Sequence, residues 1–254
     1  MHITQIVFSP TGGTQKVVDI FSGTWNARFN TIDLTNPALD FSTFNIDPND
    51  LVILAVPSYA GRVPALAAKR LSQIQGHDAR CVLVCVYGNR AYEDTLIELS
   101  DLASQCHFQV VAAIATIAKH SILTQFATNR PDTSDVAELQ SYARQIQDKL
   151  NSGRSDLTVS QLPGNRPYKQ TKGGIIPYAT DECNECSLCA TLCPAQAIDP
   201  ANPKLTDPNL CISCMRCVAK CPNQARQLNP EQLENLIARV KDAISSRKNN
   251  ELFL

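Results

Sequence analysis

The sequence has little of what nucleic-acid-binding and membrane-spanning proteins require. Its 254 residues include 23 Lys and Arg against 24 Asp and Glu, so no basic excess is available to neutralise phosphate groups. The longest apolar runs, residues 51–57 and 110–118, are about half as long as a membrane-spanning helix, and Thr116 interrupts the second run. We therefore expect no nucleic-acid partner and no membrane span.

A secretion signal is also missing from the start of the sequence. Residues 1–5 lack a basic region and lead directly into an apolar segment that is typical of a β-strand. This pattern predicts a cytoplasmic protein. Because cysteines stay reduced in the cytosol, the eleven cysteines predict metal binding or redox chemistry rather than disulfides.

The cysteines divide the sequence into two parts. Eight of the eleven lie between Cys183 and Cys221, and the other three are scattered through an apolar first part, where we expect buried thiols. Between the two parts the chain is rich in Gly, Pro and polar residues. The sequence thus predicts a first domain over 1–150, a linker over 151–176, a small second domain over 177–228 and a C-terminal helix over 229–254.

The first 150 residues alternate short apolar runs with helical patterns. The runs are rich in Val, Ile and Leu, which is typical of strands covered by helices on both faces. We expect strands over residues 3–8, 30–34, 51–56, 81–87 and 108–118, and helices over 14–27, 64–75, 92–105 and 134–150. This alternation of strands and helices predicts an α/β domain with a doubly wound parallel sheet.

The cysteine block is an internal repeat. The pattern that starts at Cys183 recurs from Cys211, and each copy reads C-x-x-C-x-x-C-x-x-x-C-P. The close triplet can reach three corners of one iron-sulfur cube. The fourth iron then needs a remote ligand, which the two copies can supply to each other. One 4Fe-4S cluster would use Cys183, Cys186, Cys189 and Cys221, and the other would use Cys211, Cys214, Cys217 and Cys193.

Structural zinc is the alternative for these cysteines, but zinc sites use pairs of cysteines rather than triplets with crossed fourth ligands. Residues 177–228 instead resemble the bacterial two-cluster ferredoxins in motif, repeat and length. The resemblance implies a small α+β domain that carries two 4Fe-4S clusters.

A hydroxyl- and glycine-rich loop, Ser-Pro-Thr-Gly-Gly-Thr over residues 9–14, follows the first expected strand. It leads into a helix N-terminus, where backbone N–H groups and the helix dipole favour a phosphate. The loop matches neither the G-x-x-x-x-G-K-[ST] motif that binds nucleoside triphosphates nor the G-x-G-x-x-G motif that binds dinucleotides. A capped turn that binds no ligand is the alternative. The candidate phosphate contacts are Ser9, Thr11, Gly12, Gly13 and Thr14.

Two further loops follow the expected strands that end at residues 56 and 87. Each joins a glycine to an aromatic residue, which suits a planar ring that is stacked upon and contacted by backbone amides. Loops at the carboxyl ends of parallel strands share one edge of the sheet, where such folds bind ligands. The candidate contacts are Pro57, Ser58, Tyr59, Ala60, Gly61, Gly88, Asn89 and Tyr92.

With these three loops, residues 1–150 resemble the flavodoxin-like fold. The resemblance implies that the first loop binds the phosphate of FMN and that the other two flank its ring system. Flavodoxins commonly read T-x-T-G-N-T in the first loop, whereas here Gly13 takes the Asn position and Pro10 enters the loop.

Nearly the whole sequence is similar to the flavodoxin-ferredoxin fusion family of anaerobic microbes. This resemblance implies electron transfer between FMN, two 4Fe-4S clusters and redox partner proteins, whose identity it does not give. Two alternatives stay open: a flavin-dependent oxidoreductase that reduces a small molecule at FMN with electrons from its ferredoxin domain, and a flavin-free first domain that serves only for docking. No catalytic residue is predicted, because the loops hold neither a G-x-S-x-G serine nor a carboxylate pair.

Overall fold

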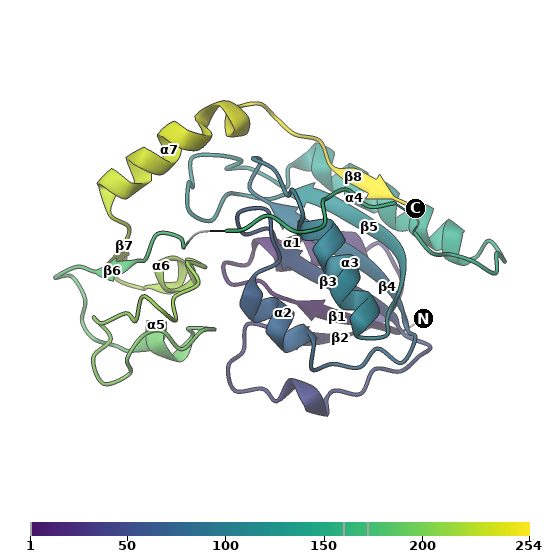
Figure 1. The fold of residues 1–254 in the computed structure, drawn as a ribbon, viewed down its shortest axis with the longest axis horizontal. Coiled ribbons are helices and arrows are strands. Elements are labelled where there is room, and N and C mark those ends of the chain that lie inside the picture. Colours follow the sequence, from purple (N-terminus) through teal and green to yellow (C-terminus); the bar gives the residue numbers. More distant parts are fainter. Residues whose placement is uncertain (1, 160, 172) are drawn as a thin grey trace.

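The apolar runs of the first domain form one twisted sheet. The computed structural model describes residues 2–159, 161–171 and 173–254. Five strands are parallel, in the order β2-β1-β3-β4-β5, and a short antiparallel strand, β8, adds to the β5 edge (Figure 1). Their bounds are β1 His2–Val7, β2 Arg28–Asp33, β3 Leu51–Pro57, β4 Arg80–Tyr87, β5 Gln109–Ile117 and β8 Glu251–Phe253. The predicted doubly wound α/β sheet is therefore confirmed.

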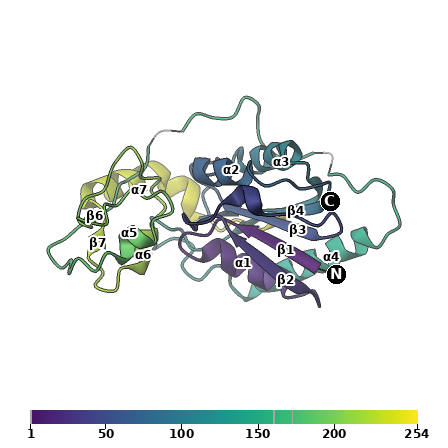
Figure 2. The ribbon, with the colours of Figure 1, turned by 90° about the horizontal axis from the view of Figure 1, so that it is seen from below.

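Helices cover both faces of this sheet, as Figure 2 shows. On one face α1 (Gly13–Ser22) packs beside α4 (Thr133–Leu150), and on the other α2 (Ala65–Leu71) packs beside α3 (Thr95–Gln105). A short 3-10 helix, η1, spans Phe41–Thr43. Each face has its own apolar core, because the side chains of a strand alternate between the two faces of the sheet. Among the described residues, no helix has the length and apolar character needed to cross a membrane.

Helix α1 ends before the position that the sequence predicts. It stops at Ser22, and the N–H of Gly23 bonds to the carbonyl of Asp19. The chain then turns, so that the Trp25 ring lies edge-on to Phe21 at 4.7 Å and its indole N–H donates to the carbonyl of Ala143 in α4. Burial of this ring between two helices outweighs the helical pattern of the local sequence.

The expected linker lies across the surface beside α3 (Figure 1). The described residues of 151–176 form neither helix nor strand. The Asp94 carboxylate accepts from the backbone N–H groups of Asn165 and Lys169, at 2.9 and 2.7 Å. Further along α3, Asp101 pairs with Arg166 and Tyr168. These carboxylates hold the segment against the first domain.

The second domain is small and lies beyond the carboxyl ends of the parallel strands (Figures 1 and 2). It contains an antiparallel pair of short strands, β6 (Tyr178–Ala179) and β7 (Arg226–Gln227), and two short helices, α5 (Leu188–Thr191) and α6 (Arg216–Lys220). Apart from these elements, the domain consists mostly of the loops that carry the cysteines.

The C-terminal segment is only partly helical. Helix α7 spans Pro230–Ser245, and the Asn229 side chain caps it by accepting from the N–H of Gln232. The start agrees with the prediction, but the expectation of a helix to residue 254 is wrong. Residues 251–253 instead form β8, which pairs with Ala113–Ala115 of β5 and covers an otherwise open sheet edge.

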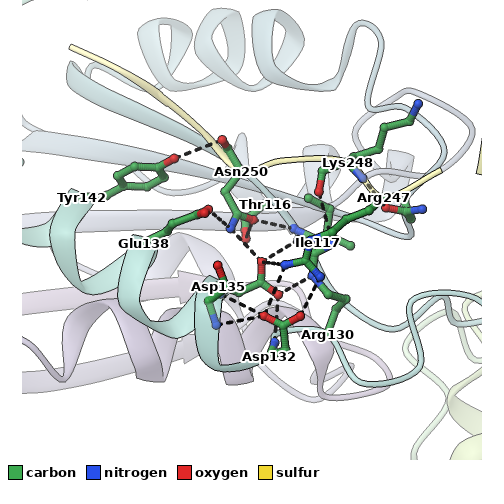
Figure 3. A network of polar contacts seen from close by, with 12 residues as sticks. Thr116, Ile117, Arg130, Asp132, Asp135, Glu138, Tyr142, Arg247, Lys248 and Asn250 are labelled. Atoms are coloured by element: carbon green, nitrogen blue, oxygen red, sulfur yellow. Dashed lines mark hydrogen bonds and ion pairs between the residues drawn. The ribbon is translucent and has the colours of Figure 1, made fainter.

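A buried polar network fixes the segment that leads into β8 (Figure 3). The Asn250 side chain accepts from Thr116 Oγ1 at 2.7 Å and donates to Asp135 and Glu138 at 2.9 and 2.6 Å. The guanidinium of Arg130 pairs with the fully buried Asp135. The chain end is thus attached to both β5 and α4.

We expect Arg130→Met to destabilise the first domain by about 3–5 kcal/mol, because it removes the close guanidinium partner of the buried Asp135 carboxylate and leaves only the longer contact with Arg247, at 3.5 Å. Urea unfolding followed by circular dichroism measures this change. Arg144→Met, at an exposed position of α4, serves as the control. Equal destabilisation by both substitutions would show that burial of the Arg130 pair does not matter.

Candidate functional site

Four cysteines from both copies of the repeat surround one cavity in the second domain. Small or apolar side chains such as Ala195, Ala197 and Ile198 complete its lining. The cysteines are Cys193 from the first copy and Cys211, Cys214 and Cys217 from the second. Burial raises the pKa of Cys214 and Cys217 to about 12, so thiolates at these positions require a positive partner such as iron.

The backbone repeats with the sequence. In each copy, three residues at matching positions have positive φ and turn the cysteine loop inward: Glu185, Ser187 and Gln196 in the first copy, and Ser213, Met215 and Gln224 in the second. Helices α5 and α6 also begin at matching positions of the two copies. The repeat is therefore structural, and the first set of cysteines occupies positions equivalent to those of the second.

Backbone N–H groups point at the sulfur of the last cysteine in each copy. Ala197 donates to Cys193 Sγ and Ala225 donates to Cys221 Sγ, both at 3.3 Å. Such hydrogen bonds are one means by which proteins stabilise cluster sulfurs. Among the described residues, no group of three or more His, Cys, Asp or Glu side chains lies close enough together to hold a single metal ion.

A second hollow lies at the carboxyl edge of the parallel sheet, at the point where the strand order reverses between β1 and β3. It is lined by the loops that follow β1, β3, β4 and β5. Seven of the candidate residues line it: Thr11, Gly13, Thr14, Pro57, Ser58, Tyr59 and Gly88. We call this hollow the switch-point pocket.

The sequence reasoning missed the loop after β5 and some residues next to the predicted contacts. The missed lining residues are Pro10, Val86, Tyr87, Ala118, Lys119, His120 and Ser121. The predicted strand over 108–118 could have indicated this loop, because the carboxyl end of a parallel strand lies at the same edge of the sheet as those of its neighbours. Burial lowers the pKa of His120 to about 4, so its ring is neutral at pH 7 and accepts the N–H groups of Ile122 and Leu123.

Ser9 and Gly12 shape the first loop without lining the pocket. Gly12 has φ +91°, a left-handed conformation that glycine adopts without strain, and it precedes α1 directly. Ser9 Oγ accepts from the N–H of Gln15 at 2.9 Å, which satisfies one free donor of the helix start. The N–H groups of Gly13 and Thr14, in the first turn, have no carbonyl partner within the helix and can therefore bind an anion.

Asn89 and Tyr92, predicted as ring contacts, do not line the pocket. The buried Asn89 amide donates to the carbonyls of Ile244 and Ser246, and its oxygen accepts from the N–H of Lys248. Tyr92 donates to Glu251 at 3.0 Å. Both side chains are used to attach the C-terminal segment, which the sequence reasoning had treated as a separate helix.

Ala60 and Gly61 also lie outside the pocket and form a tight turn. Both have positive φ, and the backbone groups of Tyr59 and Arg62 bond to each other across them. A Cβ atom at Gly61 would approach Glu93 Oε2 to 1.8 Å, so the position requires glycine. The Arg62 side chain is held by Glu98 at 2.6 and 2.8 Å, which fixes one end of the turn.

The cysteine cavity and the switch-point pocket lie next to each other. Arg216 lines the cavity and donates to Thr35 Oγ1 at 2.8 Å, and it also reaches the carbonyl of the pocket residue Pro10. Tyr59 lines the pocket, and its pKa is raised well above its ordinary value by burial and by the negative charge of Cys214. Through Arg216, the cavity lined by the second set of cysteines therefore adjoins the first domain, whereas Cys186 of the first set is exposed to solvent.

Comparisons with known proteins identify an iron-sulfur domain in the second part of the chain. Residues 182–226 match the 4Fe-4S dicluster domain family, within the predicted range 177–228. An uncharacterized polyferredoxin-like protein of Methanocaldococcus jannaschii is 38% identical over 60 residues, which are 24% of this chain. The matched segment spans 26% of that relative's length.

Solved structures are similar to the first part of the chain. A flavodoxin of Streptococcus pneumoniae TIGR4 has 13% identity and a TM-score of 0.43, with 59% of this chain and 99% of that chain covered. Rubredoxin oxygen:oxidoreductase of Desulfovibrio gigas has 15% identity and a TM-score of 0.44, with 59% and 36% covered. The strand order 2-1-3-4-5 is itself the flavodoxin-like order. The chain thus joins a domain of flavodoxin-like topology to a 4Fe-4S dicluster domain, the architecture of a flavodoxin-ferredoxin fusion.

Proposed function

We propose that this protein transfers electrons between FMN, bound in the switch-point pocket, and two 4Fe-4S clusters, which exchange electrons with redox partner proteins. The observation that carries the proposal is the contact between the two sites. Arg216, which lines the cysteine cavity, donates to Thr35 Oγ1 and reaches the carbonyl of Pro10 in the first loop. Two redox sites in such proximity suit a relay. The reduced cysteines that it requires favour a cytoplasmic location.

The cysteines would hold the clusters in crossed sets. Cys193 would complete the second cluster with Cys211, Cys214 and Cys217, in agreement with the cavity that these four line. By the symmetry of the repeat, Cys221 would complete the first cluster with Cys183, Cys186 and Cys189. The small alanines around the cavity leave room for the inorganic core.

The switch-point pocket has the groups that FMN needs. The start of α1 offers the N–H groups of Gly13 and Thr14 and the hydroxyls of Thr11 and Thr14 to a phosphate. Tyr59, from the loop after β3, provides an aromatic surface for the ring system, and Gly88, from the loop after β4, leaves room for the His120 ring that lines the same pocket. Lys119 places a positive charge at the pocket rim.

When bound, FMN exchanges two electrons and each cluster exchanges one, so the two clusters together match one flavin. The positions of the cysteines indicate the order in which electrons would pass between the flavin pocket and the two clusters. The cavity of the second cysteine set adjoins the first domain through Arg216, and the first set has the exposed Cys186. We infer that redox partners dock beside the first set.

The direct test is the composition of the protein after anaerobic purification and iron-sulfur reconstitution. We expect about eight iron, eight acid-labile sulfide and one FMN per chain, because two cubes and one flavin are proposed. Iron, sulfide and released flavin are measured on the same sample. Eight iron without flavin would contradict the relay and would leave a ferredoxin with a docking domain. Rapid steady-state reduction of a small acceptor would instead favour a flavin-dependent oxidoreductase.

Two double variants test the crossed ligation. Cys193→Ala with Cys214→Ala removes two ligands of one proposed cluster, and we expect about four iron to remain. Cys193→Ala with Cys186→Ala damages both proposed clusters, so both are expected to lose iron. The two variants carry the same number of substitutions and differ only in which copies they affect. The opposite pattern in the iron analysis would show that each copy ligates its own cluster.

Thr14→Val tests the phosphate loop. The substitution keeps the shape of this buried side chain and removes its hydroxyl, so we expect FMN affinity to fall about tenfold, as for the loss of one hydrogen bond to a charged group. Quenching of FMN fluorescence on titration measures the dissociation constant. Thr24→Val, at a buried hydroxyl outside the pocket, is the matched control and should bind FMN like the unmodified protein. An unchanged affinity for Thr14→Val would argue against phosphate binding at this hydroxyl.

A further inference from the structure

The two copies of the cysteine repeat carry different side chains at an equivalent buried position. Ile198 in the first copy corresponds to Arg226 in the second, and each is 3% exposed. Each follows the C-P-x-Q-A segment of its copy and lies in a short antiparallel pairing. The repeat thus keeps the backbone and the burial at this position but replaces an aliphatic side chain with a guanidinium.

The guanidinium of Arg226 contacts the first set of cysteines. Its Nη1 donates to Thr206 Oγ1 at 2.8 Å. Its Nη2 donates to the carbonyl of Pro203 and lies 3.6 Å from Cys189 Sγ, within hydrogen-bonding range of sulfur. In the other set, Cys217 takes the place of Cys189, and the residue that corresponds to Arg226 is Ile198, which has no side-chain donor.

Arg226 has fewer partners than a buried cation requires. Its Nε is buried without a hydrogen-bond partner, and no ion pair joins Arg226 to a carboxylate among the described residues. A buried guanidinium is unfavourable unless negative charge lies nearby. We therefore infer that the cysteine thiolates are the anions that stabilise the buried charge of Arg226.

On the basis of the proposed function, we propose that Arg226 is a redox-tuning residue that raises the reduction potential of the cluster held by Cys183, Cys186, Cys189 and Cys221 above that of the second cluster. A cluster with four thiolate ligands is anionic and becomes more negative when it gains an electron. A fixed positive charge and an N–H group directed at a ligand sulfur both stabilise the reduced form. The second cluster lacks the equivalent contact, because Ile198 stands at the position that corresponds to Arg226.

The asymmetry gives a direction to the relay. The cavity of the second set adjoins the first domain through Arg216, whereas Cys186 of the first set is exposed to solvent. With the higher potential there, one electron on the two clusters is held mainly by the outer one, which is oxidised in turn when the partner protein accepts that electron. Each transfer oxidises one centre and reduces the next, and no proton is required.

The test is a potentiometric titration of the holoprotein followed by electron paramagnetic resonance. Arg226→Ile installs the residue of the other copy. For this variant we expect the higher of the two cluster reduction potentials to fall by at least about 59 mV, which corresponds to a tenfold change in the equilibrium constant of a one-electron reduction. The lower potential should change less. Arg226→Lys keeps the charge and should retain most of the difference, and Arg239→Gln, which removes an exposed charge from α7, should leave both potentials unchanged.

Iron and sulfide analysis of each variant separates the possible failures. Unmodified protein without clusters would contradict the proposed function itself. About eight iron in Arg226→Ile with unchanged potentials would overturn the tuning role while leaving the clusters in place. Arg226→Gln is the second uncharged variant. Loss of iron from both uncharged variants would also overturn the inference, in favour of a structural role for Arg226.

Discussion

Because the five parallel strands run in the same direction, the loops that follow them meet at one edge of the sheet, and the proposed flavin site depends on that edge. The switch-point pocket is formed there from loops that are far apart in the sequence. The second domain adjoins the same edge, through Arg216. A sheet of mixed direction would have divided these loops between two edges and separated the two sites.

Buried arginines hold the two domains at a short and defined separation. Arg70, on α2, donates to the carbonyl of Leu34 in the first domain at 2.6 Å and to that of Pro194 in the second at 2.7 Å. Desolvation lowers the pKa of Arg70, but its guanidinium donors are satisfied by the two carbonyls, one from each domain. Ile212 adds an apolar contact to the core of the first domain. Electron transfer depends steeply on distance, so a fixed separation matters more here than it would for a flexible pair of domains.

The C-terminal segment supports a loop that borders the switch-point pocket. By binding the Asn89 side chain, residues 244–248 hold the loop after β4 in place, and β8 then closes the sheet beside β5. The buried Arg130–Asp135 pair anchors this arrangement on α4 (Figure 3). The chain end therefore stabilises a loop that borders the pocket, although it lines no part of the pocket itself.

Sequence alone was sufficient for the features that depend on short-range spacing. The apolar runs determined the strands, since a strand buried on both faces needs no distant partner to be recognised, and the cysteine spacing determined the repeat. Tertiary structure decided which loop residues face the pocket, since Asn89 and Tyr92 are taken by a chain end that is remote in the sequence. It also decided that residues 251–253 form a strand, because so short a segment carries no usable periodicity and pairs only when an open edge is presented to it. The position of Arg226 beside Cys189 belongs to the same class, because a long side chain's partners are set by packing and not by its neighbours in the chain.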